Sequence, residues 1–114
     1  MAGKFELNKS ANGQFYFRLK AGNGEIILSS EQYKAKVDAE GGIAAAKVNA
    51  ADDARFERKT STAGEPYFVL RAANGQSLGR SEMYSSAAGM EKGIASVMAN
   101  APTAAVNDIS EKAS

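Results

Sequence analysis

The sequence predicts an α+β protein built from two tandem copies of one β-β-β-α-α unit around a shared core. Residues 5–50 align with residues 56–101 at a constant offset of 51, without a gap, and 19 of the 46 paired positions are identical. Such fixed-period similarity indicates a duplicated structural unit. Within each unit, strand-like alternation gives way to helical spacing of apolar residues. A unit of this size is marginal as a folded body, so we expect the two halves to bury one core together.

This organisation predicts a single domain over residues 1–114. We place the first unit at 3–52 and the second at 54–103. The tail, residues 104–114, is shorter and can add one further strand.

Each unit opens with segments that alternate apolar and polar side chains, as half-buried strands do. In the first unit these are residues 5–7, 15–20 and 25–28. The turns between them carry glycine, and Asn23-Gly24 recurs as Asn74-Gly75. Because Asn-Gly tolerates the positive φ of two-residue hairpin turns, we predict a three-stranded antiparallel meander in each unit.

Comparison of the two copies separates the faces of these strands. The positions that stay apolar in both copies are assigned to the core: Phe5/Phe56, Phe17/Phe68, Leu19/Leu70 and Ile27/Leu78. Ile26 and Leu28 become Ser77 and Gly79 in the second copy. We therefore assign Ile26 and Leu28 to the solvent face.

Two helical segments are expected after each meander. The first begins at Ser30 or Ser81, where the serine can cap the first backbone N–H groups. The second has apolar residues at helical spacing, which predicts a stripe packed on the sheet: Ala39, Ile43, Ala46 and Ala50 in one copy, and Met90, Ile94, Val97, Met98 and Ala101 in the other.

The composition restricts the chemistry that the chain can perform. There is no Cys and no His, and the net charge is +1. These facts remove thiolate chemistry, the usual zinc sites and the commonest acid/base group at neutral pH. The N-terminal residues have no apolar signal region and no run is long enough to cross a bilayer. We expect a cytoplasmic protein that binds no membrane, has no catalytic residues and holds no cofactor or metal.

One constellation is a candidate binding face. Tyrosine recurs on the strands opposite the core, and basic residues alternate in register with it: Tyr16, Arg18, Lys20, Tyr67 and Arg71. Aromatic and basic sheet faces stack bases and hold phosphates in several nucleic-acid-binding modules. The competing interpretation is that an uncovered sheet needs charge to stay soluble and to discourage edge pairing.

Three other pairs have both a functional and a structural interpretation. Glu6 and Glu57 could approach as an acid/base pair, or could be solvated strand residues paired with Arg or Lys. Ser30 and Ser81 could act as nucleophiles only with an activating base, so we expect them to cap. Tyr33 and Tyr84 could line a cleft, but we expect them to pack at the junction of helix and sheet.

The motifs resemble those of the YegP-like family. They are Gly-Lys-Phe-Glu at 3–6, Phe-Tyr-Phe-Arg-Leu-Lys-Ala at 15–21, Asn-Gly at 23–24, Ser-Glu-Met-Tyr-Ser-Ser at 81–86 and Lys-Gly-Ile-Ala-Ser-Val at 92–97. The resemblance implies one antiparallel sheet with the helices on one face, pseudo-twofold symmetry, and exchange of the C-terminal strand of a unit onto its neighbour. It implies no activity.

We therefore interpret the chain as a monomeric, noncatalytic module for protein interaction or structure. The alternative is a weak binder of nucleic acid or another polyanion through the basic and aromatic face. A small enzyme is the third class.

Overall fold

A single seven-stranded sheet carries two α-helices in the computed structural model, which describes residues 3–110. The first unit contains β1 (Lys4–Lys9), β2 (Phe15–Lys20), β3 (Ile26–Ser29) and α1 (Lys36–Asn49). The second contains the short 3-10 turn η1 (Asp53–Arg55), β4 (Phe56–Thr60), β5 (Pro66–Arg71), β6 (Ser77–Arg80) and α2 (Ala87–Asn100). The turn η2 (Ala101–Thr103) and β7 (Ala105–Asp108) follow. The α+β class and the duplication are confirmed.

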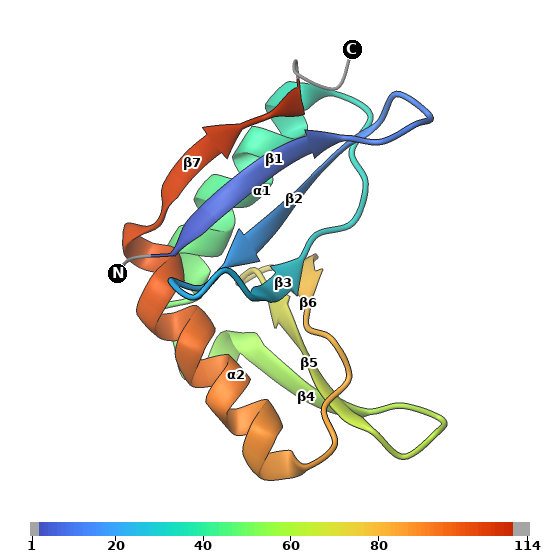
Figure 1. The fold of residues 1–114 in the computed structure, drawn as a ribbon, viewed down its shortest axis with the longest axis vertical. Helices are drawn as coiled ribbons and strands as arrows, with labels where there is room; N and C mark the ends of the chain where they lie inside the picture. The colour runs from blue at the N-terminus through green and yellow to red at the C-terminus, as the bar shows by residue number, and fades with distance from the viewer. Residues whose placement is uncertain (1–2, 111–114) are drawn as a thin grey trace.

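The strand order, β4-β5-β6-β3-β2-β1-β7, joins the two predicted meanders at their third strands. Within each meander the neighbouring strands are antiparallel. The join itself pairs Ser29 with Arg80, which are equivalent residues of the two units. A pseudo-twofold axis therefore passes between β3 and β6, and Figure 1 shows the two halves of the sheet on either side of these short strands.

The last strand crosses from the second unit to the first. After α2 and η2 the chain runs along the outer edge of β1, where β7 pairs in parallel from Lys4↔Ala105 to Leu7↔Asp108. Strand exchange between units is thus confirmed, and Figure 1 shows β7 beside β1. The sheet is mixed rather than wholly antiparallel, because the helix and turn before β7 return the chain to the start of β1.

One hydrophobic cluster contains residues of both units. The inward side chains Phe5, Phe17 and Leu19 of the first unit and Phe56, Phe68 and Leu70 of the second are at most 5% exposed. The predicted helical stripes of α1 and α2 belong to the same cluster, with Met98 partly buried at its margin. Phe17 packs edge-to-face against Phe5, with the ring centroids 5.7 Å apart. The equivalent pair, Phe68 and Phe56, has the same geometry with a centroid distance of 5.6 Å.

The turns differ from the two-residue form that Asn-Gly suggested. The amide of Ala21 donates to Glu25 O and the amide of Gly24 donates to Ala21 O, so three residues bridge the strands. Gly24 alone takes positive φ, at 88°, while Asn23 does not. This is a type I turn followed by a left-handed glycine.

The segments expected to start a helix at Ser30 and Ser81 are extended instead. Each serine hydroxyl accepts from an amide of the neighbouring strand, at 2.8 Å from Phe17 N and 3.0 Å from Phe68 N. Tyr33 then pairs with Phe15 through two backbone hydrogen bonds of 2.6 and 2.7 Å. The serines therefore extend the sheet pairing, and the prediction of a helix cap at these positions is wrong.

Helix α2 has a side-chain cap that α1 lacks. The Ser86 hydroxyl accepts from the Gly89 amide at 3.0 Å, whereas Ala35 occupies the same place before α1 and makes no such bond. Neither α1 nor α2, the α-helices of residues 3–110, has the length and hydropathy that crossing a bilayer requires.

Leu28 was assigned to the solvent face, yet only 1% of it is exposed. The register between β2 and β3 shifts after Leu19, so Ile27 and Leu28 both reach the core. Across the pseudo-twofold axis Leu28 meets its own equivalent, Gly79, where an added Cβ would lie 3.0 Å from the leucine Cγ. The sequence difference at this position therefore serves packing at the axis, where there is room for one large side chain.

Candidate functional site

The side of the sheet opposite the buried residues, here called the open face, carries the predicted binding residues. On β2, Tyr16, Arg18 and Lys20 alternate with Phe17 and Leu19, which are fully buried. On β5, Tyr67 and Arg71 alternate with Phe68 and Leu70 in the same way. Because successive strand residues point to opposite sides, all five predicted residues lie on the open face.

Two adjoining grooves run over this face. The first groove has a volume of about 500 Å³ and is lined by Tyr67 and Arg71, together with Lys59 and Arg80. The second groove, of about 490 Å³, is lined by Tyr16 and Arg18. Both include Ser29 and Ser30, so they meet near the pseudo-twofold axis. The structure thus divides four of the predicted residues between two grooves, and Lys20 lines neither.

The two tyrosines have different surroundings. The Arg18 guanidinium lies over the ring of Tyr16, with its central carbon 5.2 Å from the ring centroid, which is a cation–π contact. Tyr67 pairs across the strands with Lys59. One face of the Tyr16 ring is therefore already covered by a cation.

Carboxylates neutralise part of the positive charge. The Lys20 ammonium is 3.0 Å from Glu6, whose side chain is 13% exposed. The Arg71 guanidinium donates to Glu57 at 2.7 Å, and this hydrogen bond lowers the pKa of the Glu57 carboxyl. Of the five predicted residues, Lys20 and Arg71 thus have an acidic partner, and Arg18 stacks on Tyr16.

Sequence reasoning missed Lys59 and Arg80, which line the first groove. Among residues 3–110, neither has a carboxylate within ion-pair distance. Alternation with Glu57 could have placed Lys59 on the open face. Arg80 gave no comparable signal, because its position is serine in the other copy and depends on the pairing of β3 with β6.

Glu6 and Glu57 cannot act as an acid/base pair. They lie on β1 and β4, which are five strand positions apart in the sheet, or roughly 24 Å at the usual strand spacing. Each is instead paired with cations, Glu6 with Lys20 and Lys4, and Glu57 with Arg71. The acid/base interpretation is therefore wrong.

The serines are occupied by the backbone. The Ser30 hydroxyl accepts from Phe17 N and donates to Glu31 O at 2.8 Å, and Ser81 makes the equivalent bonds with Phe68 N and Glu82 O. Among residues 3–110, no carboxylate or amine contacts either hydroxyl. A nucleophilic role therefore lacks the activation it needs.

Tyr33 and Tyr84 pack as expected between helix and sheet. The ring of Tyr33 stacks on Phe17 and that of Tyr84 on Phe68, each with a centroid distance of 6.3 Å. The pKa of both hydroxyls is raised, mainly because the hydroxyls are partly buried. An added Cβ at Gly42 of α1 would lie 2.6 Å from the Tyr33 hydroxyl. Tyr33 also borders a cleft of about 390 Å³ beside α1.

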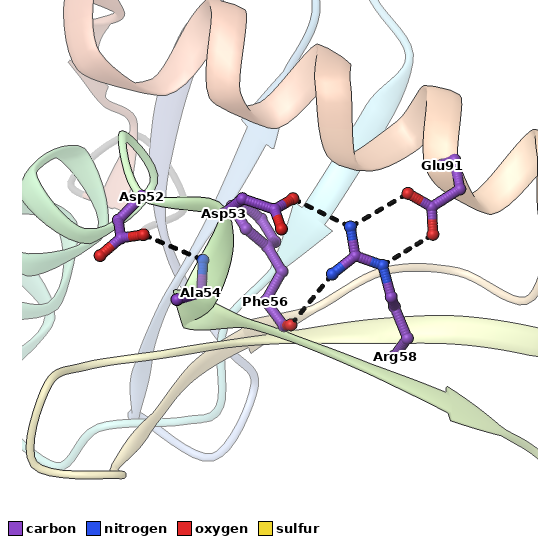
Figure 2. Close-up of polar contacts among 6 residues, drawn as sticks. All are labelled: Asp52, Asp53, Ala54, Phe56, Arg58 and Glu91. Carbon is purple, nitrogen blue, oxygen red and sulfur yellow. Dashed lines mark hydrogen bonds and ion pairs between the residues drawn. The ribbon is translucent and has the colours of Figure 1, made fainter.

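A separate ionic cluster surrounds Arg58 at the far edge of the sheet (Figure 2). The guanidinium donates from Nε and Nη2 to the two carboxylate oxygens of Glu91, at 2.7 and 3.0 Å. Nη2 also donates to Asp53 at 2.9 Å, and Nη1 reaches the carbonyl of Phe56 at 3.5 Å. The hydrogen bond from Arg58 lowers the pKa of Glu91, while Glu91 and Asp53 raise that of Arg58.

Carboxylates gather nowhere in the described chain as a metal site would require. Within residues 3–110, no group of three or more His, Cys, Asp or Glu side chains is close enough to hold a metal ion. The polar groups of the open face are mainly cations and hydroxyls, which suit an anionic ligand.

Comparison with known proteins agrees with the duplication. The family described as a domain of unknown function (DUF1508) matches residues 10–57 and again residues 61–108. A UPF0339 protein of Acinetobacter baylyi is 51% identical over 109 residues, which cover 96% of this chain and 98% of the relative. The UPF0339 protein YegP of Escherichia coli is 53% identical over 108 residues, which cover 95% of this chain and 98% of the relative.

Two solved structures have the same fold. The solution NMR structure of YegP from E. coli, a protein of unknown function, has a TM-score of 0.91 at 52% identity and covers 96% of this chain and 95% of its own. A solution NMR structure of a UPF0339 protein from Shewanella oneidensis has a TM-score of 0.92 at 46% identity, covering 98% and 95%. None of these names indicates a catalytic activity.

The match in both units, the nearly full-length identity to UPF0339 proteins and the shared fold confirm the resemblance inferred from the motifs. This chain belongs to the DUF1508 family of YegP-like UPF0339 proteins, a family without an assigned function.

Proposed function

We propose that the protein is a noncatalytic interaction module whose open face binds an acidic segment of a protein partner. The observation that carries this proposal is the composition of the two adjoining grooves. Five lysine or arginine side chains line them, against a single carboxylate, Glu31. A ligand laid across both grooves would contact both units at once.

The chemistry of the grooves favours carboxylates. Arginine presents a planar fork of donors that matches a carboxylate, and Arg80 has no acidic partner of its own within residues 3–110. The large apolar side chains that are exposed lie on separate elements, Val37 and Val48 on α1, Met83 before α2, and Val106 on β7. An apolar partner surface thus has no matching patch, whereas an acidic one has the open face.

A noncatalytic role accords with the state of the candidate groups. Glu6, Glu57 and the hydroxyls of Ser30 and Ser81 all have structural partners, as described above. General acid/base or nucleophilic catalysis needs a group that is free to exchange a proton with a substrate.

Nucleic acid is the competing ligand for the same surface. Stacking of bases needs accessible ring faces. One face of Tyr16 is covered by Arg18, which leaves Tyr67 as the better platform and provides little for a chain of successive bases. An acidic peptide requires no such stacking, and so it fits this surface better.

A fluorescence-anisotropy titration with a labelled decapeptide of glutamate tests the proposal. We expect weak binding at low salt that falls as salt rises, and a loss of roughly three- to tenfold in affinity for the double variant Lys59→Ala/Arg80→Ala. The matched control, Lys34→Ala/Lys92→Ala, removes the same charge outside the grooves and should bind as the parent does.

A labelled single-stranded oligonucleotide forms the second arm of the experiment. Tighter binding of the oligonucleotide, reduced by Tyr16→Ala/Tyr67→Ala, would replace the acidic peptide by nucleic acid as the ligand. Absence of binding to either probe at low salt would refute the proposed role of the open face, as would equal losses in the groove and control variants.

A further inference from the structure

The outer edge of β4 is open, although the equivalent edge of β1 is covered. On β1, the carbonyl of Leu7 accepts from the Ile109 amide at 2.9 Å, and β7 pairs along four residues. No strand of residues 3–110 pairs with the outer side of β4. An unpaired strand edge is a template for pairing with another chain.

The residue that faces inward at this edge is charged. Arg58 is the equivalent of Leu7 at the offset of 51, and it lies on β4 between Glu57 and Lys59, which are on the open face. Leu7 is fully buried, whereas 35% of the Arg58 side chain is exposed. Where the first unit has a buried leucine on the strand beside β7, the second unit thus has a guanidinium at the margin of the core.

The guanidinium is held at the edge from both sides. Glu91 of α2 binds it through two hydrogen bonds, and Asp53 of η1 through a third (Figure 2). Its Nη1 is also 3.5 Å from the carbonyl of Phe56. By alternation this carbonyl points to the outer edge of β4, as the carbonyl of the equivalent Phe5 points toward β7. The arginine therefore reaches an acceptor that an added strand would need.

We propose that Arg58, held by Glu91 and Asp53, closes the β4 edge against a second copy of this chain. The excluded contact is antiparallel pairing of β4 with the β4 of the other copy, which is self-complementary and gives a closed twofold dimer. Such pairing needs the outward carbonyl of Phe56, which Arg58 contacts, and it would bring two clusters of Arg58, Glu91 and Asp53 to one seam, where removing water from their charges is costly. An inward-pointing charge on an edge strand is a known protection of this kind. This inference is independent of the open face, since Arg58 points to its other side.

The variant Arg58→Leu restores the residue of the equivalent position and tests the closure. Sedimentation velocity of the full chain over about a hundredfold range of concentration should show a monomer for the parent and a dimer with a Kd of roughly 100 μM or tighter for the variant. Amide exchange should slow at residues 56–60 in the dimer. The control, Lys92→Leu, makes the same kind of change on α2 and should remain monomeric.

A second variant, Asp53→Asn/Glu91→Gln, covers the case in which Arg58→Leu does not fold. It keeps Arg58 but removes the charges of Asp53 and Glu91, which bind the guanidinium. Because at least half of each of these two side chains is exposed, the variant should keep the fold. We expect measurable association at high concentration, with slower amide exchange at residues 56–60 in the associated form. The proposal is overturned if either folded variant stays monomeric with parental exchange along β4. It is overturned equally if Lys92→Leu associates as strongly as Arg58→Leu.

Discussion

At one end of the sheet β1 buries Leu7 beside β7, whereas at the other end β4 exposes Arg58 at the equivalent position of its unit. The other inward residues of the two strands, Phe5 and Phe56, are buried alike. The duplicated units therefore share a core but differ where the sheet ends. A strand can keep an apolar residue at this position where another strand pairs with it, as β7 pairs with β1. On β4, which is an edge strand, the equivalent position carries a charged side chain.

The largest expected effect concerns the shared core, where equivalent substitutions in the two units should lower the free energy of unfolding by similar amounts. Phe17→Ala and Phe68→Ala each remove a fully buried ring that packs in the same way. We expect each to lower the free energy of unfolding by about 3–5 kcal/mol, measured by denaturant titration. The change Lys20→Ala, at a side chain that is 28% exposed and ion-paired with Glu6, should cost about 1 kcal/mol or less. If one of the two phenylalanines could be truncated without a shift in midpoint, the units would not share the core equally.

The second test compares the equivalent edge residues directly. Leu7→Ala should lower the free energy of unfolding by about 2–5 kcal/mol, because the leucine is fully buried in the core. Arg58→Ala should lower it by about 1 kcal/mol or less, since its ion pairs are solvent-exposed. Equal losses for the two variants would show that Arg58 is as much a part of the core as Leu7.

The third test uses neighbouring glycines of α1. An added Cβ at Gly42 meets the Tyr33 hydroxyl at 2.6 Å and the Phe17 ring at 3.0 Å, while one at Gly41 meets nothing within 4 Å. We expect Gly42→Ala to destabilise by about 1–3 kcal/mol through overpacking. Gly41→Ala should stabilise by roughly 0.5–1 kcal/mol, because alanine is the better helix former. Thermal unfolding of the two variants would contradict this account if their midpoints moved in the same direction.

The smallest effect concerns the strand that covers β1. The Asp108 carboxylate accepts hydrogen bonds from Lys36 and from Ser110, which lower its pKa from 3.8 to about 2. Above about pH 5 the carboxylate is ionised in both the folded and the unfolded state, so the stabilisation is complete. Between about pH 5 and 2 the unfolded chain takes up the proton first, and stability therefore falls as the pH falls.

The variant Asp108→Asn isolates this contribution from those of other carboxylates. The difference in urea midpoint between the parent and Asp108→Asn should be largest at neutral pH and shrink as the pH falls from about 5 to 2. A difference that does not vary with pH would mean that the ion pair with Lys36 does not hold β7 in place.

Much of the fold follows from local sequence signals. The offset of 51, the period-two alternation and the recurring glycine turns predicted both meanders, and the helical spacing predicted α1 and α2. The same alternation placed Tyr16, Arg18, Tyr67 and Arg71 on the open face. The alternation, the turns and the helical spacing depend on residues a few positions apart, and so one sequence is enough to reveal them.

Other features depend on segments that meet only in the folded chain. The bulge that buries Leu28 arises from the pairing of β2 with β3, and Arg80 joins the first groove because β6 lies against β3. The extended course at Ser30 and Ser81 also needed tertiary structure. Their side chains resemble helix caps in sequence, but the free amides of Phe17 and Phe68 on the neighbouring strands bind them instead.

One repeated segment takes a different place in the fold in each of its two copies, and the sequence does not show this difference. The two family matches end at residues 57 and 108, so β7 corresponds to residues 54–57, which form the end of η1 and the first two residues of β4. The amino-acid sequence alone showed that the unit recurs and where its meanders, their turns and the apolar stripes of α1 and α2 lie, because periodicity and turn chemistry are local. Only the tertiary structure decided that one copy of this segment opens the second meander while the other returns to cover β1. That choice depends on which edge is free when the two units pack together.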